Sequence, residues 1–367
     1  MVKTADVAVV GGGPAGLAAA IALRAHGADV VVIDGAGPGP IDKACGEGLM
    51  PDSLEALRKL GVQVTGHPFR GIRFVGSGTA VEADFPGSVG LGVRRTVLHQ
   101  EMTRVAGEAG VRFEWGSPVT GLKLGSILLG STHTIQSKWV VGADGGFSSV
   151  RRWCGLHERM RVKERFGFRK HFRVAPWSEH VEVHWGDCCQ VYVTPVGECE
   201  VGAAVVSSDP RLRFDEALVQ FPVLAKQLEG RDLSSPERGG VSASRRLRKV
   251  VSGNVVLIGD ASGSVDAVTG EGMSLAFHQA PALAAAIQSG KLEEYESAHT
   301  RIGWRPALMS EVMLMLSARS GLRDRVFPAM AARPKVFSGM LASHIGVGHP
   351  AAMASHLVAL GWTMAMG

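Results

Sequence analysis

Apolar runs and a glycine-rich break alternate over the first forty residues of the chain. Residues 7–10 are an apolar run, residues 11–16 interrupt it, and residues 17–25 continue with the small-residue spacing of a helix. A second apolar run follows at residues 29–33. Short apolar runs bounded by turns are typical of buried strands. The order strand, glycine turn, helix, strand therefore predicts one βαβ unit.

Helical and strand patterns continue along the chain. Residues 52–60 and 96–109 have the spacing of amphipathic helices, and residues 139–142 form another buried strand. Beyond residue 160 the pattern changes to alternating apolar and polar positions, which predicts an antiparallel sheet. Its strands are expected at residues 169–174, 180–185, 190–195 and 200–207.

The pattern of the first domain then returns. A buried strand is expected at residues 254–258 and a helix from residue 272, so the chain revisits its first domain after an excursion. We predict an α/β fold with a Rossmann-like domain, an interleaved antiparallel-sheet domain and C-terminal helices. The expected segments are 1–65, 90–155 and 250–290 for the first domain, 66–89 and 156–249 for the second, and 291–367 for the helical region.

Composition fits an ordinary folded protein. Apolar residues make up 46% of the 367 residues and charged residues 20%, without a long charge run. The net charge of +5 includes arginine clusters at residues 151–152, 159–173 and 245–249, but no interleaved aromatics, so no nucleic-acid partner is expected. A mildly basic surface suits anionic substrates, nicotinamide phosphates or acidic lipid head groups, or it is simply a solvated face.

Cysteine content and the two termini bear on location. The five cysteines are odd in number and lack metal-ligand spacing, so no metal site is expected. Met1 leads into an apolar run without a signal peptide, which predicts a cytoplasmic location. Residues 351–366 are apolar but contain His356 and are too short for a bilayer span. Membrane contact is therefore expected to be peripheral at most.

The break at residues 11–16 fits the dinucleotide motif G-x-G-x-x-G. In this motif Gly11 makes the tight turn, Gly13 admits a pyrophosphate, and Gly16 packs the helix on the strand. The helix start then directs free N–H groups and a positive dipole end at the phosphates. Asp34, at the end of the second strand, can accept hydrogen bonds from ribose hydroxyls. The alternative is a glycine turn that binds no ligand.

Two later segments add to the glycine motif. Residues 142–145 read Gly-Ala-Asp-Gly, and residues 257–261 read Leu-Ile-Gly-Asp-Ala, followed by Thr-Gly-Glu-Gly at residues 269–272. Together with the glycine motif, they resemble flavoproteins with the p-hydroxybenzoate hydroxylase fold, and within these the geranylgeranyl reductase-like branch. The resemblance implies that the dinucleotide is FAD.

The matching residues have chemistry that suits a flavin. Asp260 follows a buried strand, and its carboxylate either accepts hydrogen bonds from ribityl hydroxyls or caps a helix. Backbone N–H groups from Gly270 to Gly272 would stabilise negative charge on the flavin N1 and C2 oxygen. Arg95 matches a family arginine near the flavin and phosphates, or it is a surface arginine at a helix start. The predicted FAD-binding residues are Gly11, Gly13, Pro14, Ala15, Gly16, Asp34, Lys43, Ala44, Cys45, Arg95, Asp144, Gly145, Gly259, Asp260, Gly270, Glu271, Gly272 and Met273.

The loop at residues 43–49, Lys-Ala-Cys-Gly-Glu-Gly-Leu, resembles the loop that the reductase branch places beside the isoalloxazine. Aromatic hydroxylases usually have an arginine-containing segment there. Cys45 is expected to tune the flavin or position substrate, or it is an inert buried thiol. Glu47 is a proton donor or a helix-start carboxylate. These two are the predicted catalytic residues.

Substrate is expected between the antiparallel sheet and the flavin, because pockets concentrate at domain interfaces. His171, His184 and Tyr192 are the predicted substrate-contacting residues, but strand alternation leaves open which face is inward. A strand histidine is otherwise a hydrogen-bonded wall residue. Apolar residues at 191–196 and the methionines of residues 309–315 indicate a hydrophobic ligand or ordinary core packing.

Two family signatures are absent. The reductase signature Pro-x-x-Tyr-x-Trp-x-Phe-Pro is replaced by Gln-Val-Tyr-Val-Thr-Pro-Val-Gly at residues 190–197, which argues against an isoprenoid substrate. The Trp-x-Trp-x-Ile-Pro segment of flavin halogenases is also missing, and no motif places a lysine to carry a haloamine.

Three functions fit these features. The favoured one is an FAD-dependent oxidoreductase in which reduced flavin N5 delivers hydride to a carbon–carbon double bond of a hydrophobic small molecule. The second is a monooxygenase that hydroxylates an aromatic or polyketide-like substrate through a C4a-hydroperoxyflavin. The third is a non-catalytic redox sensor, against which the elaborate sheet domain argues. Because no second G-x-G-x-x-G is present, electrons are expected from NAD(P)H at the same cleft or from a partner reductase.

Overall fold

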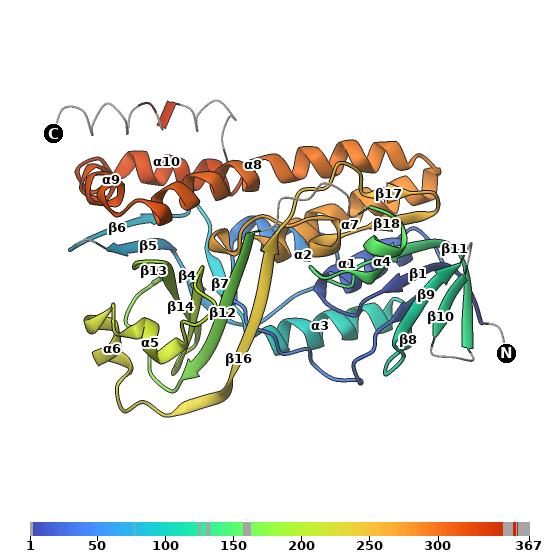
Figure 1. The fold of residues 1–367 in the computed structure, drawn as a ribbon, viewed down its shortest axis with the longest axis horizontal. Coiled ribbons are helices and arrows are strands. Elements are labelled where there is room, and N and C mark those ends of the chain that lie inside the picture. The colour runs from blue at the N-terminus through green and yellow to red at the C-terminus, as the bar shows by residue number, and fades with distance from the viewer. Residues whose placement is uncertain are drawn as a thin grey trace.

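The computed structural model describes residues 3–76, 78–123, 126–129, 133–156, 163–347, 355, 356 and 358. Figure 1 shows a mainly parallel sheet at one end of the molecule, a mainly antiparallel sheet at the other, and the C-terminal helices lying across both. This arrangement confirms the predicted α/β fold class.

The first sheet has eight strands, with β1 (Lys3–Val10) at its centre. β1 runs parallel to β2 (Val30–Ile33) on one side and to β11 (His133–Gly142) on the other. Beyond them lie the parallel strands β8 (Arg112–Glu114) and β18 (Val255–Leu257). Antiparallel additions are β17 (Val251–Ser252), β9 (Val119–Lys123) and β10 (Ser126–Leu129). Because the strand order reverses at β1, a crevice is expected outside the carboxyl ends of these strands.

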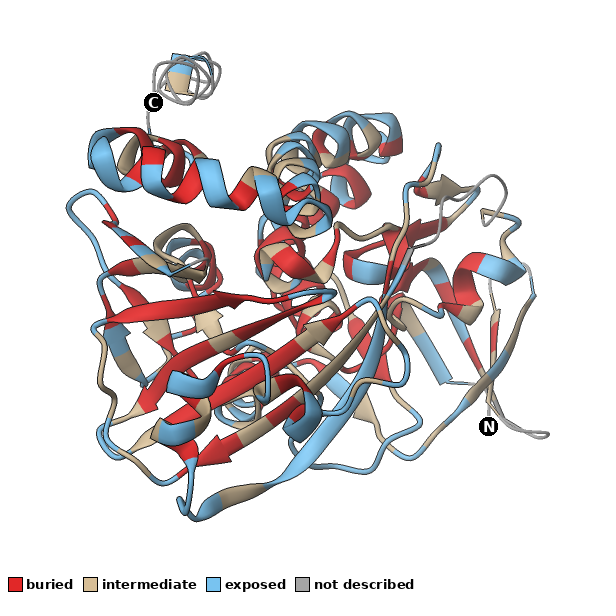
Figure 2. Ribbon diagram, turned by 60° about the vertical axis from the view of Figure 1, so that its left-hand side comes forward, coloured by how far each residue is buried: buried red, intermediate tan, exposed pale blue. Residues whose placement is uncertain are grey.

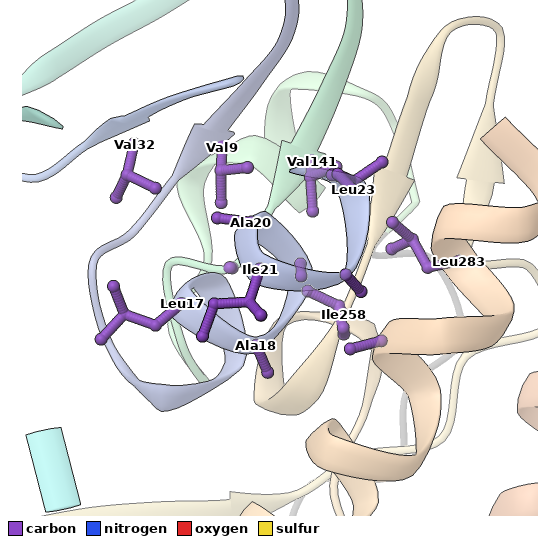
Figure 3. Packing of buried hydrophobic residues seen from close by; sticks show 14 of the residues in the cluster. Val9, Leu17, Ala18, Ala20, Ile21, Leu23, Val32, Val141, Ile258 and Leu283 are labelled. Carbon is purple, nitrogen blue, oxygen red and sulfur yellow. The ribbon is translucent and has the colours of Figure 1, made fainter. Parts of the chain in front are cut away.

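Helix α1 (Pro14–Ala25) is buried on nearly every side. Proline at its first position suits a helix start, and its run of alanines allows close packing. Figure 3 shows Leu17 and Leu23 of α1 packed among Val9 and Val141 of the sheet, with Leu283 of α7 (Gly272–Ser289) on the far side. This packing holds the glycine turn firmly at the carboxyl edge of the sheet.

The second sheet has seven strands in the order β16-β12-β15-β14-β13-β5-β6. Their bounds are β16 (Leu233–Ser244), β12 (Lys163–Phe172), β15 (Glu200–Ser207), β14 (Cys189–Gly197), β13 (His180–Trp185), β5 (Gly71–Gly76) and β6 (Thr79–Asp84). One face packs on α5 (Phe214–Leu218) and α6 (Pro222–Leu228). The central strands are buried, whereas the edge strand β16 is largely exposed (Figure 2).

The other face of this sheet packs against the C-terminal helices. These helices are α8 (Leu292–Ala318), α9 (Ser320–Ala332) and α10 (Pro334–His344), and α9 and α10 lie over β5 and β6 (Figure 1). Between the sheets lie β3 (Gly48–Leu49), β7 (Gly90–Gly92) and β4 (His67–Phe69), which pair with one another. The remaining helices are α2 (Pro51–Lys59), α3 (Arg95–Glu108), α4 (Ser149–Trp153) and the 3-10 turns η1 (Gly259–Ser262) and η2 (Ala267–Thr269).

The observed elements follow most of the predicted ones. The strands expected at residues 180–185 and 200–207 are β13 and β15, and the helix expected at residues 96–109 is α3, shifted by one residue. The domain boundaries stay predictions. The helical pattern and apolar tail expected at residues 348–367 lie outside the described residues except at 355, 356 and 358. No helix in the described part of the chain is long and apolar enough to cross a membrane.

Candidate active site

Four parallel strands end at one edge of the first sheet, and each is followed by predicted site residues. Gly11 follows β1, Asp34 follows β2, Asp144 follows β11 after one alanine, and Asp260 lies three residues after β18. Because carboxyl ends of parallel strands share an edge, the structure brings these segments together at the switch point between β2 and β11. Their roles as FAD ligands stay predictions.

The glycine turn shows why its residues are small. Gly11 has φ +111°, a backbone conformation that favours glycine. A Cβ at Gly16 would lie 1.9 Å from the Gly11 carbonyl oxygen, so the helix can approach the strand only without a side chain there. At Gly13, in contrast, a Cβ would meet no atom within 4 Å. The open space beside Gly13 and the start of α1, where Pro14 and Ala15 lie, fits a phosphate group.

Asp34 and His99 hold the glycine turn in place. Asp34 Oδ2 accepts a hydrogen bond of 2.6 Å from the Gly12 N–H, and Oδ1 accepts one of 2.7 Å from the Ala36 N–H. The buried His99 lies with Nε2 2.8 Å from the Gly12 carbonyl oxygen, and burial lowers the pKa of His99. A neutral His99 therefore donates to Gly12. Sequence reasoning missed His99, although it lies one helical turn after Arg95.

Asp144 caps the short helix α4. Its carboxylate accepts hydrogen bonds from Ser148 Oγ at 2.5 Å, from the Ser149 N–H at 2.7 Å and from the Val150 N–H at 3.1 Å. The next residue, Gly145, has φ +82° and turns the chain into the helix. The structure thus gives Asp144 a structural task at the edge of the predicted FAD site.

Asp260 and the start of α7 carry free polar groups. The Asp260 carboxylate is exposed and accepts no hydrogen bond from the described residues. The protein crowded around it raises the pKa of Asp260, against the positive charges of Arg95, Lys43 and Arg151. Gly259 and Gly270 adopt left-handed φ values of +59° and +70°. No side chain caps α7 at Glu271, so the N–H groups of Gly272 and Met273 remain for a ligand.

The predicted flavin loop lies between Arg95 and the second sheet. Arg95 Nη1 is 3.2 Å from Met273 Sδ, and its Nε is buried with no hydrogen-bond partner among the described residues. Burial raises the pKa of Cys45, so its thiol stays protonated, although Arg95 opposes the shift. Lys43 is exposed and Ala44 is half-buried.

Glu47 is held in a strained backbone conformation by two strong contacts. Its φ is +58°, which is uncommon for a residue other than glycine. Glu47 Oε1 accepts from the Arg95 N–H at 2.7 Å, as a helix-start carboxylate does. Glu47 Oε2 lies 2.5 Å from His171 Nε2, and both side chains are buried. Glu47 therefore joins α3 to the second sheet directly behind Cys45.

His171 continues this network toward the surface. His171 Nδ1 is 2.6 Å from Ser235 Oγ and 2.6 Å from Arg169 Nη1, and Arg169 pairs with Asp42. Burial tends to raise the pKa of Asp42, but hydrogen bonds and charges from Arg238 and Arg169 hold it below its usual value. The charged pair stays intact at neutral pH and orients His171.

A large apolar cavity begins at this loop. It is partly open to solvent and is lined mainly by Val, Leu, Ile, Met and Phe side chains. At one end are Cys45, Glu47 and Gly270, and the walls come from β5, β13, β14 and the C-terminal helices. The apolar lining suits a hydrophobic ligand.

The cavity separates the three predicted substrate residues. Tyr192 lines it, with its hydroxyl donating to the Val268 carbonyl oxygen at 2.5 Å. His171 does not line the cavity, but it contacts Glu47, which does. His184 lies on the opposite face of β13, where it is 3.0 Å from Glu182 Oε2 and packs near Phe221. The alternation of β13 was correctly predicted, but only the covering helices show that Val181 and Val183 face the cavity.

The family of the chain follows from a match over residues 4–305 to the family described as FAD binding domain. The chain belongs to this family. Its free space beside Gly13, the unpartnered Asp260 carboxylate and the uncapped start of α7 fit FAD. Within the described residues, no group of three or more His, Cys, Asp or Glu side chains could hold a metal ion.

Curated relatives narrow the branch. The chain is 30% identical over 337 residues to a menaquinone reductase of Mycolicibacterium smegmatis, covering 84% of this chain and 80% of that protein. It is 31% identical over 300 residues to a menaquinone reductase of Mycobacterium tuberculosis, covering 74% and 73%. It is also 28% identical over 335 residues to digeranylgeranylglycerophospholipid reductase 1 of Methanothermobacter thermautotrophicus, covering 81% and 82%. The protein is an FAD-dependent oxidoreductase of the geranylgeranyl reductase-like type.

Solved structures agree on the fold. A geranylgeranyl bacteriochlorophyll reductase-like protein from Thermoplasma acidophilum matches with TM-score 0.77 and 19% identity, over 98% of this chain and all of that one (100%). A flavoprotein/dehydrogenase from Cytophaga hutchinsonii matches with TM-score 0.79 and 18% identity, over 93% and 92%.

Proposed function

We propose that this oxidoreductase reduces a carbon–carbon double bond in the polyprenyl chain of a quinone or lipid. The observation that carries the proposal is the apolar cavity, which extends from Cys45 and Gly270 to the C-terminal helices. An extended hydrocarbon chain gains free energy by leaving water for such a cavity. The relatives support the same substrate class, because the molecules in their names carry isoprenoid chains.

The absence of the reductase signature at residues 190–197 is compatible with a polyprenyl substrate. Residues 190–197 belong to β14, and Tyr192 and Thr194 still line the cavity. Tyr192 is held by Val268, and Thr194 Oγ donates to the Gly46 carbonyl oxygen at 2.7 Å. Both hydroxyls are therefore satisfied by the protein and present their apolar sides to the ligand.

In this proposal the residues of the chain stabilise the reduced flavin, hold the cavity wall in place and surround the substrate. FAD, when bound, supplies the hydride. The uncapped start of α7 would stabilise negative charge that reduction places on the flavin. Glu47 fixes the Cys45 loop against α3, which keeps that wall of the cavity in place. The apolar walls surround the reacting bond with side chains that offer it no hydrogen-bond partner.

Electrons reach the flavin, in this proposal, from NAD(P)H bound transiently at the same cleft or from a partner reductase. Anaerobic titration of the purified holoprotein with NADH and with NADPH distinguishes these sources. Bleaching of the flavin by either nucleotide supports direct transfer, and bleaching only after addition of a reductase supports a partner.

The test of the function is an anaerobic single-turnover reaction. Holoprotein with chemically reduced flavin is mixed with a menaquinone or with a geranylgeranyl lipid, and the product is analysed by mass spectrometry. A gain of two hydrogen atoms on the side chain, together with flavin reoxidation, is expected. A product that gains oxygen after admission of air would support hydroxylation instead, and no product in either case would support a redox sensor.

Two adjacent positions on α8 give a matched pair of variants. Met309 lines the cavity, whereas Leu308 is 40% exposed. Met309→Phe should narrow the cavity and weaken substrate binding about tenfold, on the order of 1.4 kcal/mol. Leu308→Phe adds the same ring outside the cavity and should bind as the unaltered protein does. Equal affinities for both variants would contradict the assignment of this cavity.

A further inference from the structure

Three ionisable side chains lie near one another beside the cavity. The proposed function gives them no joint role. Asp52 comes from α2, Glu271 precedes α7, and His344 ends α10. His344 Nε2 lies 3.5 Å from Glu271 Oε1, and the two side chains are only 9% and 4% exposed. His344 also lines the cavity. The cluster therefore joins an apolar substrate space to a buried acid.

Each member of the cluster carries a buried atom without a partner in the described part of the chain. These atoms are Glu271 Oε2, His344 Nδ1 and Asp52 Oδ1. Buried polar atoms are nearly always hydrogen-bonded, so such a concentration at one place calls for a function or a bound group. A metal ion is not supported, since the described residues contain no group suited to hold one.

Burial favours the neutral form of both members of the central pair. Burial, together with the charge of Asp52, raises the pKa of Glu271 well above its usual value. Burial lowers the pKa of His344 to about 4, although Asp52 acts in the opposite direction. In the neutral pair Glu271 carries a carboxyl proton, and His344 carries one N–H. With the acid proton directed at Nε2, the histidine proton is on Nδ1, the atom that has no partner.

The other hydroxyl groups in the cavity wall are already engaged. Tyr192 donates to Val268, Thr194 donates to Gly46, and Thr269 donates to the Asp266 carbonyl oxygen. The Glu47 carboxylate is likewise engaged, by the Arg95 N–H and by His171. The apolar side chains around a reacting double bond offer it no proton. Reduction nevertheless requires one proton for each hydride, so the wall must contain a donor that can be replenished.

We propose that His344, with Glu271 behind it, donates the proton to the substrate double bond, and that Asp52 and His278 connect this pair to solvent. The inference rests on the proposed reduction of a double bond. His344 would be a catalytic residue, because it faces the substrate space, and Glu271 would be a positioning and relay residue.

The step balances in atoms and electrons. Hydride supplied by the reduced cofactor forms a C–H bond to one alkene carbon, and the π bond breaks. His344 Nδ1 gives its proton to the other alkene carbon, while Nε2 takes the carboxyl proton of Glu271. The Glu271 carboxylate is then reprotonated from solvent. The distance of 3.5 Å between Nε2 and Oε1 must shorten for transfer, as is common when a substrate completes a site.

Polar contacts along the first turns of α7 connect Asp52 to an exposed histidine. Asp52 Oδ2 accepts from Ser274 Oγ at 3.0 Å and lies 3.4 Å from His278 Nε2. The His278 side chain is 40% exposed. Asp52 also acts electrostatically on both Glu271 and His344. In this proposal protons enter at His278 and pass by way of Asp52 to the buried acid, without crossing the apolar cavity.

The test is the single-turnover reaction with the variant His344→Gln, run in H2O and D2O. Glutamine keeps a polar side chain but cannot relay a proton. We expect double-bond reduction to slow by about 100-fold or more. FAD content, anaerobic flavin reduction by dithionite, and equilibrium binding of a menaquinone to the oxidised holoprotein should not change. The solvent isotope effect of the unaltered protein should be altered in the variant, because the donor differs.

Two further variants secure the result. Glu271→Gln preserves shape but removes the acid proton, and it should reproduce the slow reduction and the altered isotope effect with FAD bound. His26→Gln, at an exposed histidine after the far end of α1, should react as the unaltered protein does.

The outcomes separate the two proposals. Reduction by His344→Gln at the original rate, with the original isotope effect, would overturn the proton-donor role while leaving the proposed function intact. A slow variant whose menaquinone affinity falls in proportion would also overturn it, since His344 would then only bind substrate. No double-bond reduction by the unaltered protein would contradict the proposed function and the inference together.

Discussion

Gly13 and Gly16 lie in one turn, yet the structure assigns them different tasks. A Cβ at position 16 would lie 1.9 Å from a backbone oxygen, whereas a Cβ at position 13 meets nothing within 4 Å. Gly16→Ala should therefore lower the stability of the FAD-free protein by about 1–3 kcal/mol. Gly13→Ala should leave that stability unchanged but weaken FAD binding, because its methyl group occupies the phosphate space.

Urea unfolding of the FAD-free variants, followed by fluorimetric FAD titration, checks both parts of this prediction. Equal stability losses at the two positions would contradict the division of tasks. Tight FAD binding by Gly13→Ala would show that the pyrophosphate does not approach this residue.

His299 provides a residue-scale pH prediction. Its Nε2 lies 2.9 Å from Ser262 Oγ, which itself donates to the Gly259 carbonyl oxygen, and burial lowers the pKa of His299 to about 4. In the unfolded chain a histidine pKa is about 6.5. The neutral form favoured by folding therefore contributes stability that is complete above pH 6.5 and is lost as the pH falls toward 4. His299→Gln keeps a donor but does not titrate.

Urea unfolding at pH 7.5 and at pH 5 measures this effect. The unaltered protein should lose more stability between the two conditions than His299→Gln does. An identical loss in both proteins would mean that His299 is not desolvated in the folded state.

The positions of single site residues could be predicted from the sequence where local chain geometry determines them. The glycine motif, Asp34 and Asp260 follow strands in a fixed pattern, so their convergence at one sheet edge could be predicted. His344 and Asp52 could not be identified, because their meeting depends on how distant helices pack. Asp144 satisfied the motif, but its capping of α4 appears only in the structure.

At the scale of elements, a strand can be predicted from its apolar residues only where these residues are buried. β13 and β15 have buried faces and were predicted with their observed bounds. β16 is an exposed edge strand containing Pro236 and a pair of glycines, and it gave no such signal. The helical C-terminal region was predicted, but a helix pattern does not tell which sheet it covers.

The packing of α10 on β5 gives an element-scale prediction. The Phe337 ring lies 4.9 Å from the Phe74 ring, and both rings line the cavity. Phe337→Ala should enlarge the cavity, extend the range of accepted chain lengths, and cost about 3–5 kcal/mol of stability.

Competition between short and long polyprenyl substrates measures the change in preference, and thermal unfolding measures the cost. Val358→Ala is a suitable control, because this side chain is 73% exposed. A large stability loss with unchanged chain-length preference would place the end of the substrate elsewhere in the cavity.

At the scale of the whole molecule, the predicted FAD site draws on segments scattered over most of the chain. Residues 11–16 and 34 come from its beginning, Arg95 and Asp144 from its middle, and residues 260 and 270–273 from beyond the second sheet. Within the described residues, few side-chain contacts join these segments, so the bound cofactor should join them. FAD at a hundred times its dissociation constant should stabilise the folded protein by about 2.7 kcal/mol, or roughly 3–5 °C in Tm.

Two aspartates at this site should separate cofactor binding from folding. Asp260 has an exposed carboxylate with no partner in the described structure, so Asp260→Ala should leave the FAD-free Tm unchanged and abolish the shift caused by FAD. Asp144 Oδ2 accepts from the first two N–H groups of α4, and Oδ1 accepts from the N-cap hydroxyl of Ser148. Asp144→Ala should therefore lower the stability of the FAD-free protein by about 1 kcal/mol, with a lower Tm, and leave most of the shift caused by FAD. Thermal scans with and without added FAD give both quantities for each variant. If Asp260→Ala kept the full Tm shift caused by FAD, the assignment of Asp260 to the ribityl hydroxyls would be wrong. If Asp144→Ala lost that shift without losing stability, Asp144 would be a cofactor ligand rather than a helix cap.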